Sequence, residues 1–298
     1  MNKISFGHRL EYIGALAAGS LFRIIPLKFA LITGSFLGWL VFMVLGIRKK
    51  VMLDNLLQAF PAMDIGQRKN IARRCARHFG MMTAEFARMP ILDNRYLEKY
   101  VEFDSGDAVS DAQSMGKGGL VISGHFGNWE LMGGGSSLLG YPVTYIVASQ
   151  SNPLVDKLLD DYRRNLGIEI LKLKTAAKGA LKSLKQNRFI AILIDQDAGK
   201  EGEFVDFFGK PASTHRGAAI FHLRTGAPLI FASCIRIKGP YYRVKYEKVE
   251  LKLSEGSYEQ QIREITQRLT KILEDKIKMH LEQWFWMHKR WKRKPKGD

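Results

Sequence analysis

Between residues 120 and 249 the chain alternates between short apolar segments and longer amphipathic ones, which restricts the fold more than any other feature. Short apolar runs bounded by turn residues predict buried strands, and apolar residues recurring every three or four positions predict helices. We expect helices at 153–165, 175–186 and 215–225, and strands at 120–122, 143–148, 168–171, 189–194, 228–237 and 241–249, the last as an edge strand. This alternation predicts an α/β fold whose mixed, mostly parallel sheet is covered by helices on both faces.

The first of these strands leads directly into a histidine and an acid, His125 and Glu130. A histidine can accept a proton near neutral pH when a carboxylate orients it, and Glu130 could supply that carboxylate. Residues five apart on one helix point about 140° away from each other, so His125 is expected in the loop before the helix. Gly124 and Gly127 would permit such a bend. An isolated pair of this spacing can also be a core histidine beside a surface acid.

Four further polar residues are candidates for binding substrate. Asp195 follows the strand at 189–194, the same class of position as His125, although an ordinary Asp-rich turn would look similar. Arg163 and Arg164 close the helix at 153–165. A guanidinium suits phosphate, but arginines on a helix can equally be solvated. Asn128, or backbone amides at the start of the helix that follows it, could stabilise an oxyanion.

The first 50 residues predict a membrane-anchoring segment. Residues 29–47 form an uncharged run of 19 residues, followed at once by Arg48-Lys49-Lys50. A run of this length is at the threshold for one membrane-spanning helix with a positive flank. It could instead belong to a helical pair lying in the membrane interface, or to a buried core helix. No cleavage pattern for a removable signal peptide is recognised.

The remaining chain, 51–298, is expected to form one α/β domain, with a helical lead-in at 51–115, a core at 116–250 and a C-terminal helix and tail at 251–298. The tail at 283–294 interleaves Trp284, Trp286 and Trp291 with basic residues. That composition suits a lipid headgroup interface, and it suits equally a helix end packed on the core.

The chain carries 46 Lys and Arg against 29 Asp and Glu, a formal charge of +17. Such an excess indicates anionic partners. Nucleic acid is disfavoured, because the aromatic residues lie in apolar periodic runs and no recognition motif is found. Cys75 and Cys234 lie in apolar surroundings and are expected to be buried free thiols. Motifs of serine hydrolases, NTPases, zinc proteases and dehydrogenases do not occur.

The string His-Phe-Gly-Asn-Trp-Glu at 125–130 resembles the late acyltransferases of lipid A biosynthesis, the lauroyl and myristoyl transferases. The block 195–214 resembles the second signature region of that family, which lies near the His-acid pair and helps bind substrate. Arg163 and Arg164 fall where the family carries a substrate-binding arginine. Other members of the superfamily acylate mannosylated phosphoinositides or related lipids with a similar pair.

The resemblance implies a membrane-associated enzyme at the cytoplasmic face of the inner membrane. It implies transfer of a fatty acyl group from acyl carrier protein, or from coenzyme A, to a hydroxyl of a lipid A precursor. His125 would act as general base and Glu130 would orient it, with no covalent acyl-enzyme and with no metal or organic cofactor. The rival hypothesis from another class is a non-catalytic membrane protein that holds anionic lipid.

Overall fold

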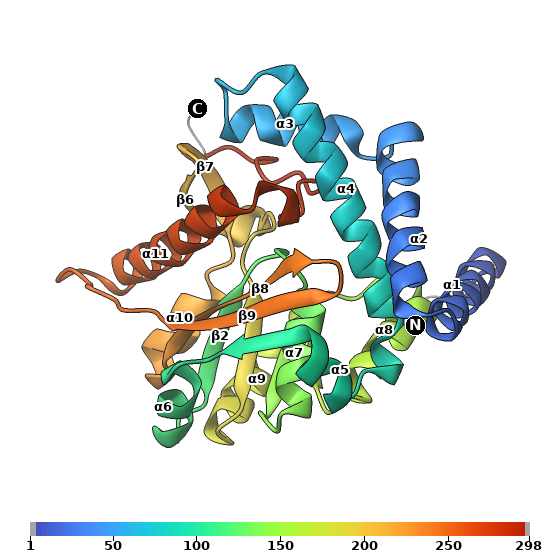
Figure 1. Cartoon of the computed structure of the whole chain (residues 1–298). Coiled ribbons are helices and arrows are strands. Elements are labelled where there is room, and N and C mark those ends of the chain that lie inside the picture. The colour runs from blue at the N-terminus through green and yellow to red at the C-terminus, as the bar shows by residue number, and fades with distance from the viewer. Residues whose placement is uncertain (1–3, 296–298) are drawn as a thin grey trace.

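The computed structural model describes residues 4–295 and has a seven-stranded sheet at its centre (Figure 1). In spatial order the strands are β1 (Val101–Asp104), β9 (Tyr241–Lys248), β8 (Leu229–Lys238), β2 (Gly119–Ser123), β5 (Phe189–Leu193), β3 (Val143–Val147) and β4 (Glu169–Lys172). All neighbours pair in parallel except β8 and β9, which pair antiparallel. The predicted mixed, mostly parallel sheet is confirmed.

One strand prediction is wrong, and three strands were not predicted. β9 is not an edge strand, because β1 pairs with it in parallel and covers its outer side. β1 itself was not predicted, since four residues of mixed polarity carry no periodic signal. The block 195–214, for which no strand was predicted, contains a separate antiparallel hairpin, β6 (Glu203–Phe207) and β7 (Lys210–Thr214).

Helices pack on both faces of the sheet, as the alternation predicted. On one face lie α9 (Ala176–Lys185), α10 (Gly217–Thr225) and α11 (Tyr258–Met279), whose apolar residues join Leu120 and Ile122 in one core cluster. On the other face lie α5 (Asn94–Tyr100), α6 (Ala108–Ser114) and α7 (Trp129–Leu138), which cover Val121. Alternate residues of β2 therefore face opposite cores, as successive strand residues must.

The N-terminal segment forms α1 (Phe6–Ile24) and α2 (Leu27–Trp39), with α2 continuing into a π-helical turn, Leu40–Val44. Among the described residues, Leu27–Val44 is the one helical stretch long and apolar enough to cross a membrane; its mean hydropathy is 1.8 and 22% of it is buried. Exposed apolar side chains line both helices, among them Phe6, Leu10, Ile13, Phe29, Ile32 and Phe36.

One side of α2 packs tightly against α4 (Ile65–Ala87), which follows the short helix α3 (Lys49–Ala59). Glycines make this approach possible. A Cβ added to Gly80 would lie 2.1 Å from the carbonyl oxygen of Gly34, and one added to Gly38 would lie 2.2 Å from that of Ala76. Any larger side chain at these positions would force the two helices apart.

The C-terminal tail is part of the core and does not form an aromatic interface. Trp284 and Trp286 are 1% and 0% exposed, and the charged Arg290 is 1% exposed. Arg290 donates hydrogen bonds to Ser213 and Thr214 of β7. The two expectations for the tail are thus resolved in favour of packing. Cys75 and Cys234 are buried free thiols, as predicted.

Candidate active site

His125 lies in the loop between β2 and α7, as its spacing from Glu130 required. The loop is bound closely to β8: Gly127 has φ +62°, and a Cβ there would lie 1.8 Å from the Cys234 carbonyl oxygen. The Gly127 amide donates to the Gln283 carbonyl, and the Asn128 amide donates to the Cys234 carbonyl. Glycine is needed at position 127 both for the left-handed backbone and for this contact.

The carboxylate that holds His125 is Asp195, at the end of β5. Its Oδ1 lies 2.8 Å from His125 Nδ1, and its Oδ2 accepts the His125 backbone amide at 2.7 Å. Trp284 Nε1 donates a third hydrogen bond to this carboxylate at 2.7 Å. Burial alone would raise the pKa of Asp195, but the charge of His125 and these hydrogen bonds lower it to about 2. Asp195 is therefore ionised at neutral pH.

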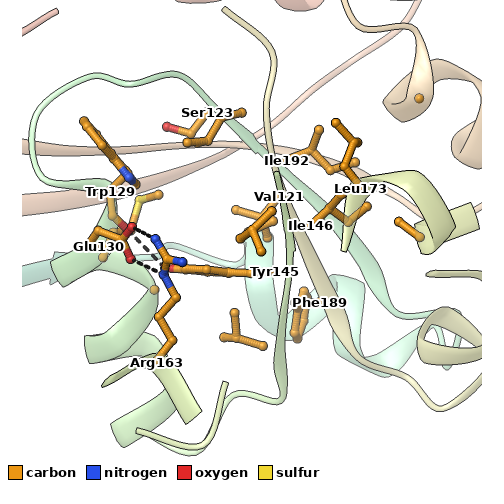
Figure 2. A pocket seen from close by; sticks show the side chains of 18 of the residues that line it. Val121, Ser123, Trp129, Glu130, Tyr145, Ile146, Arg163, Leu173, Phe189 and Ile192 are labelled. Carbon is orange, nitrogen blue, oxygen red and sulfur yellow. Dashed lines mark hydrogen bonds and ion pairs between the residues drawn. The ribbon is translucent and has the colours of Figure 1, made fainter. Parts of the chain in front are cut away.

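This pairing corrects the prediction that Glu130 orients His125. Glu130 lies in the first turn of α7 and forms a two-pronged ion pair with Arg163 of α8 (Pro153–Arg164), with atom distances of 2.5 and 3.1 Å. Figure 2 shows the carboxylate of Glu130 and the guanidinium of Arg163 pointing at each other in the pocket wall. Burial lowers the pKa of Arg163, and the Glu130 charge outweighs it, so the pKa is raised. Arg163 is therefore protonated at neutral pH.

Of the remaining residues predicted to bind substrate, one lines the cavity and two do not. Arg163 lines the pocket, whereas Arg164 is half exposed and pairs with Asp160 and Asp161 on its own helix. Asn128 is 1% exposed: its side chain caps α7 through the Leu131 amide and donates to Glu85 and Tyr242. The Asn128 amide group is thus already committed to internal hydrogen bonds and does not line the pocket.

His125 opens onto a largely apolar cavity of about 460 Å³. Part of its wall comes from one face of the sheet and α7, including Val121, Tyr145, Phe189, Gly133, Ser136 and Tyr246. Another part comes from the opposite face beside α9 and α10, including Ile146, Ile192, Leu173, Ala176, Ala177 and Phe221. In Figure 2 Ile146, Ile192 and Leu173 are grouped together, away from Glu130 and Arg163. The cavity thus extends around the carboxyl ends of β3 and β5, where ligands bind in parallel sheets.

The amide of Gln196 contacts the second imidazole nitrogen of His125. Gln196 Nε2 lies 3.2 Å from His125 Nε2, and His215 lines the same cavity. Burial lowers the pKa values of both His215 and His288, and His288 Nε2 accepts the Asp197 amide. With Nδ1 donating to Asp195, the Nε2 atom of neutral His125 is left as the site that can accept a proton.

A second buried ion pair contacts the His125 loop through Asn128. Arg236 of β8 donates to both oxygens of Glu85 of α4 at 3.0 and 2.6 Å, and Tyr242 also donates to that carboxylate. Next to it, His78 contacts the Gly127 carbonyl at 3.2 Å. None of these four residues was predicted from the sequence, since they lie on three separate elements.

The chain is similar in sequence to bacterial lipid acyltransferases. The model of the bacterial lipid A biosynthesis acyltransferase family matches residues 3–293. The chain is 26% identical to the lipid A biosynthesis lauroyltransferase of Escherichia coli K12, over 97% of this chain and 94% of that protein. It is 25% identical to the palmitoleoyltransferase of the same organism, over 84% and 81% of the two chains.

A phosphatidylinositol mannoside acyltransferase of Mycobacterium tuberculosis is 29% identical over 165 residues, so the match spans about half of that relative, 51%. The match covers 52% of the present chain. The family model, by contrast, extends over nearly all of it, including the His125 loop, Asp195 and the buried tail. The protein therefore belongs to the bacterial lipid A biosynthesis acyltransferase family.

Proposed function

We propose that the protein transfers a fatty acyl group from a thioester donor to a hydroxyl of a lipid A precursor. The observation that carries this proposal is a histidine held by an ionised, buried aspartate at the opening of a long apolar cavity. The dyad supplies a general base, and the cavity suits a hydrocarbon chain, because apolar surface is stabilised by removal from water.

In the proposed mechanism His125 Nε2 removes the proton from the acceptor hydroxyl as its oxygen attacks the thioester carbonyl. Asp195 fixes the tautomer and stabilises the imidazolium that forms. The tetrahedral intermediate then collapses with cleavage of the carbon–sulfur bond. The leaving thiolate receives the proton from His125, which returns the imidazole to its neutral form. No acyl-enzyme forms. Since Asn128 is committed elsewhere, the backbone amides at the start of α7 remain as oxyanion donors.

The donor in this proposal is acyl carrier protein, with acyl-coenzyme A as the alternative, and the acceptor is phosphorylated. Arg163 and Glu130 form a positioning pair at the cavity wall, where Arg163 can meet an acceptor phosphate while Glu130 keeps the guanidinium in place. Residues 1–50 would anchor the protein at the cytoplasmic face of the inner membrane, because the exposed apolar residues of α1 and α2 match an acyl-chain environment. Residues 51–298 would form the acyltransferase domain.

Turnover by purified wild-type protein, followed by mass spectrometry of the lipid product, tests the proposal. We expect a mass increase of one acyl chain on a lipid A precursor, and a loss of at least about 10²-fold in rate for His125→Ala and Asp195→Asn. His222→Ala is the matched control, since His222 lies on α10 and hydrogen-bonds the Ala227 carbonyl outside the cavity. Near wild-type turnover by His125→Ala would contradict the general-base mechanism. Acylation of a mannosylated phosphoinositide, and not of a lipid A precursor, would show that the acceptor assignment is wrong.

A further inference from the structure

The segment 170–194 contains no Asp or Glu and carries six cations: Lys172, Lys174, Lys178, Lys182, Lys185 and Arg188. Two of them are paired, Lys172 with Asp156 and Asp160, and Arg188 with Glu169. The other four are exposed, and within residues 4–295 no ion pair is formed by any of them. We call Lys174, Lys178, Lys182 and Lys185 the α9 lysine stripe.

The stripe occupies one side of α9. Lys178, Lys182 and Lys185 lie within an arc of about 60° on a regular helix, and Lys174 precedes them in the 3₁₀ turn Leu173–Thr175. The opposite side of α9 is buried through Ala180, Ser183 and Leu184. Like charges four residues apart destabilise a helix, so the stripe is unfavourable until an anionic partner covers it. The neighbouring α8 differs, because its Lys157 and Arg164 are balanced by acids on the same helix.

The stripe begins at the rim of the cavity. Leu173, Ala176 and Ala177 line the cavity next to the first lysines, and Leu173 is 50% exposed. An exposed apolar residue bordered by unpaired charges has the arrangement of a protein–protein interface, with an apolar centre and a polar rim. A partner seated there would have direct access to the cavity that contains His125.

The stripe is also separated from the apolar surface of the N-terminal helices. Figure 1 shows α9 at the bottom of the molecule, whereas α1 and α2 lie along its right side. The exposed apolar side chains gather on α1 and α2, and α9 contributes no large exposed hydrophobic residue of its own. This placement favours a soluble acidic partner over a continuation of the membrane surface.

We propose that the α9 lysine stripe, together with Leu173, docks the acidic carrier protein that delivers the acyl thioester. The inference rests on the proposed function and locates the donor side of the site. The carrier's acidic surface neutralises the stripe, and its thioester arm passes Leu173 and Ala177 into the cavity toward His125. Because the contacts are exposed charges, they act mainly on the association rate and weaken with salt.

Binding of purified, fluorophore-labelled acyl carrier protein to the full-length protein in detergent tests this docking surface by fluorescence anisotropy. We expect the Kd of the triple variant Lys178→Glu, Lys182→Glu, Lys185→Glu to rise about tenfold or more at low salt. The control variant Lys69→Glu, Lys238→Glu, Lys252→Glu makes the same change in net charge at exposed lysines elsewhere, and its Kd should change less than about twofold. The triple alanine variant at 178, 182 and 185 should show a smaller loss in the same direction.

Kinetics separate docking from chemistry. For the stripe variant, kcat/KM should fall about tenfold or more with the carrier-protein donor and stay unchanged with the same acyl chain on pantetheine, which is uncharged and lacks the protein. Equal losses with both donors would overturn the docking proposal, as would a wild-type Kd in the stripe variant or no carrier binding by the wild type. Carrier binding lost in the stripe variant, with no turnover of either donor by the wild type, would refute the proposed function and leave the docking surface standing.

Flotation with phosphatidylglycerol vesicles distinguishes a lipid partner from a protein partner. The stripe variant and the control variant should bind these vesicles equally well. A selective loss of vesicle binding in the stripe variant, with carrier binding retained, would assign the stripe to the lipid surface and overturn the proposal.

Discussion

Within residues 4–295 there are two buried arginine–glutamate pairs of the same chemistry in different surroundings. Arg236 and Glu85 are each 6% exposed in their side chains, and the carboxylate also accepts from Tyr242 and Asn128. Arg163 and Glu130 are 14% and 7% exposed and border the cavity. The first pair lies outside the cavity of His125, and Glu85 borders a separate, smaller pocket of about 40 Å³, while the second pair borders the cavity of His125 and can meet a ligand. Surroundings, and not the pair itself, therefore decide which pair supports the fold and which can serve substrate.

The two pairs are expected to differ most in their contribution to the stability of the fold. Arg236→Ala leaves Glu85 buried without its counter-charge, so the free energy of unfolding should fall by about 3–5 kcal/mol. Arg163→Ala should cost clearly less, because water from the cavity can reach Glu130. Denaturant unfolding of both variants in detergent measures this. Equal losses would contradict the distinction between an enclosed and a cavity-facing pair.

A pH effect is expected beside the enclosed pair. Burial, followed by the Arg236 charge, lowers the pKa of His78 to about 3. A neutral ring with its proton on Nε2 can donate to Gly127 and accept from Arg236 on Nδ1 at 3.4 Å. In the unfolded chain the same imidazole has a pKa near 6.5. The contribution of neutral His78 to the free energy of unfolding is therefore complete above that pH and is lost as the pH falls toward 3.

For one such histidine, the free energy of unfolding falls by about 1.4 kcal/mol for each pH unit in this range. Between pH 6 and 4, His78→Gln should reduce the slope of the free energy of unfolding against pH by the amount that corresponds to the uptake of one proton on unfolding. Part of the slope should persist, since burial also lowers the pKa values of His215, His280 and His288. Identical slopes in wild type and variant would show that His78 is not held neutral.

A substitution in the cavity-facing pair, Arg163 and Glu130, should change the kinetic constants for the acceptor. Arg163→Lys keeps the charge but loses the planar fork that grips Glu130, so KM for a phosphorylated acceptor should rise about tenfold while kcat changes little. A dephosphorylated acceptor should show no such difference between wild type and variant. If kcat falls and KM does not, Arg163 aligns the reacting hydroxyl and does not merely tether the lipid.

The smallest effect is expected at the neighbouring arginine. Arg164 is half exposed and its nearest acids lie 3.6 and 3.7 Å away. Arg164→Ala should therefore change the free energy of unfolding by less than about 0.5 kcal/mol and leave KM unaltered. An Arg164→Ala variant with a raised KM for phosphorylated acceptor alone would move the phosphate contact from Arg163 to Arg164.

The sequence predicted the sheet and the His125 loop because both depend on local patterns. It assigned the wrong carboxylate to His125 because proximity along the chain favoured Glu130. The sheet order decides otherwise: β2 and β5 are parallel neighbours with Ser123 opposite Leu193, so residues 125 and 195 emerge side by side. Recognising two polar strand ends as neighbours would have found the pair, but only the strand order supplies that knowledge.

Other features depend on long-range packing and leave no local signal. The tail tryptophans have a composition typical of a membrane interface, yet Trp284 donates to Asp195 and Trp286 is fully buried. The Glu85–Arg236 pair joins residues 151 positions apart in the chain. Local periodicity gives no means of choosing such partners among many charged residues.

The glycine contact between α2 and α4 has a mechanical consequence. Where Gly34 and Gly38 meet Gly80 the two backbones are in contact with no intervening side chain, so we expect a tilt of α2 to move α4 with it. Two residues of α4, one on each side of Gly80 in the chain, contact the His125 loop: His78, which touches the Gly127 carbonyl, and Glu85, which accepts a hydrogen bond from Asn128. If α2 is seated in a bilayer, as proposed, a change in bilayer thickness would thus be transmitted through α2 and α4 to the loop that carries His125.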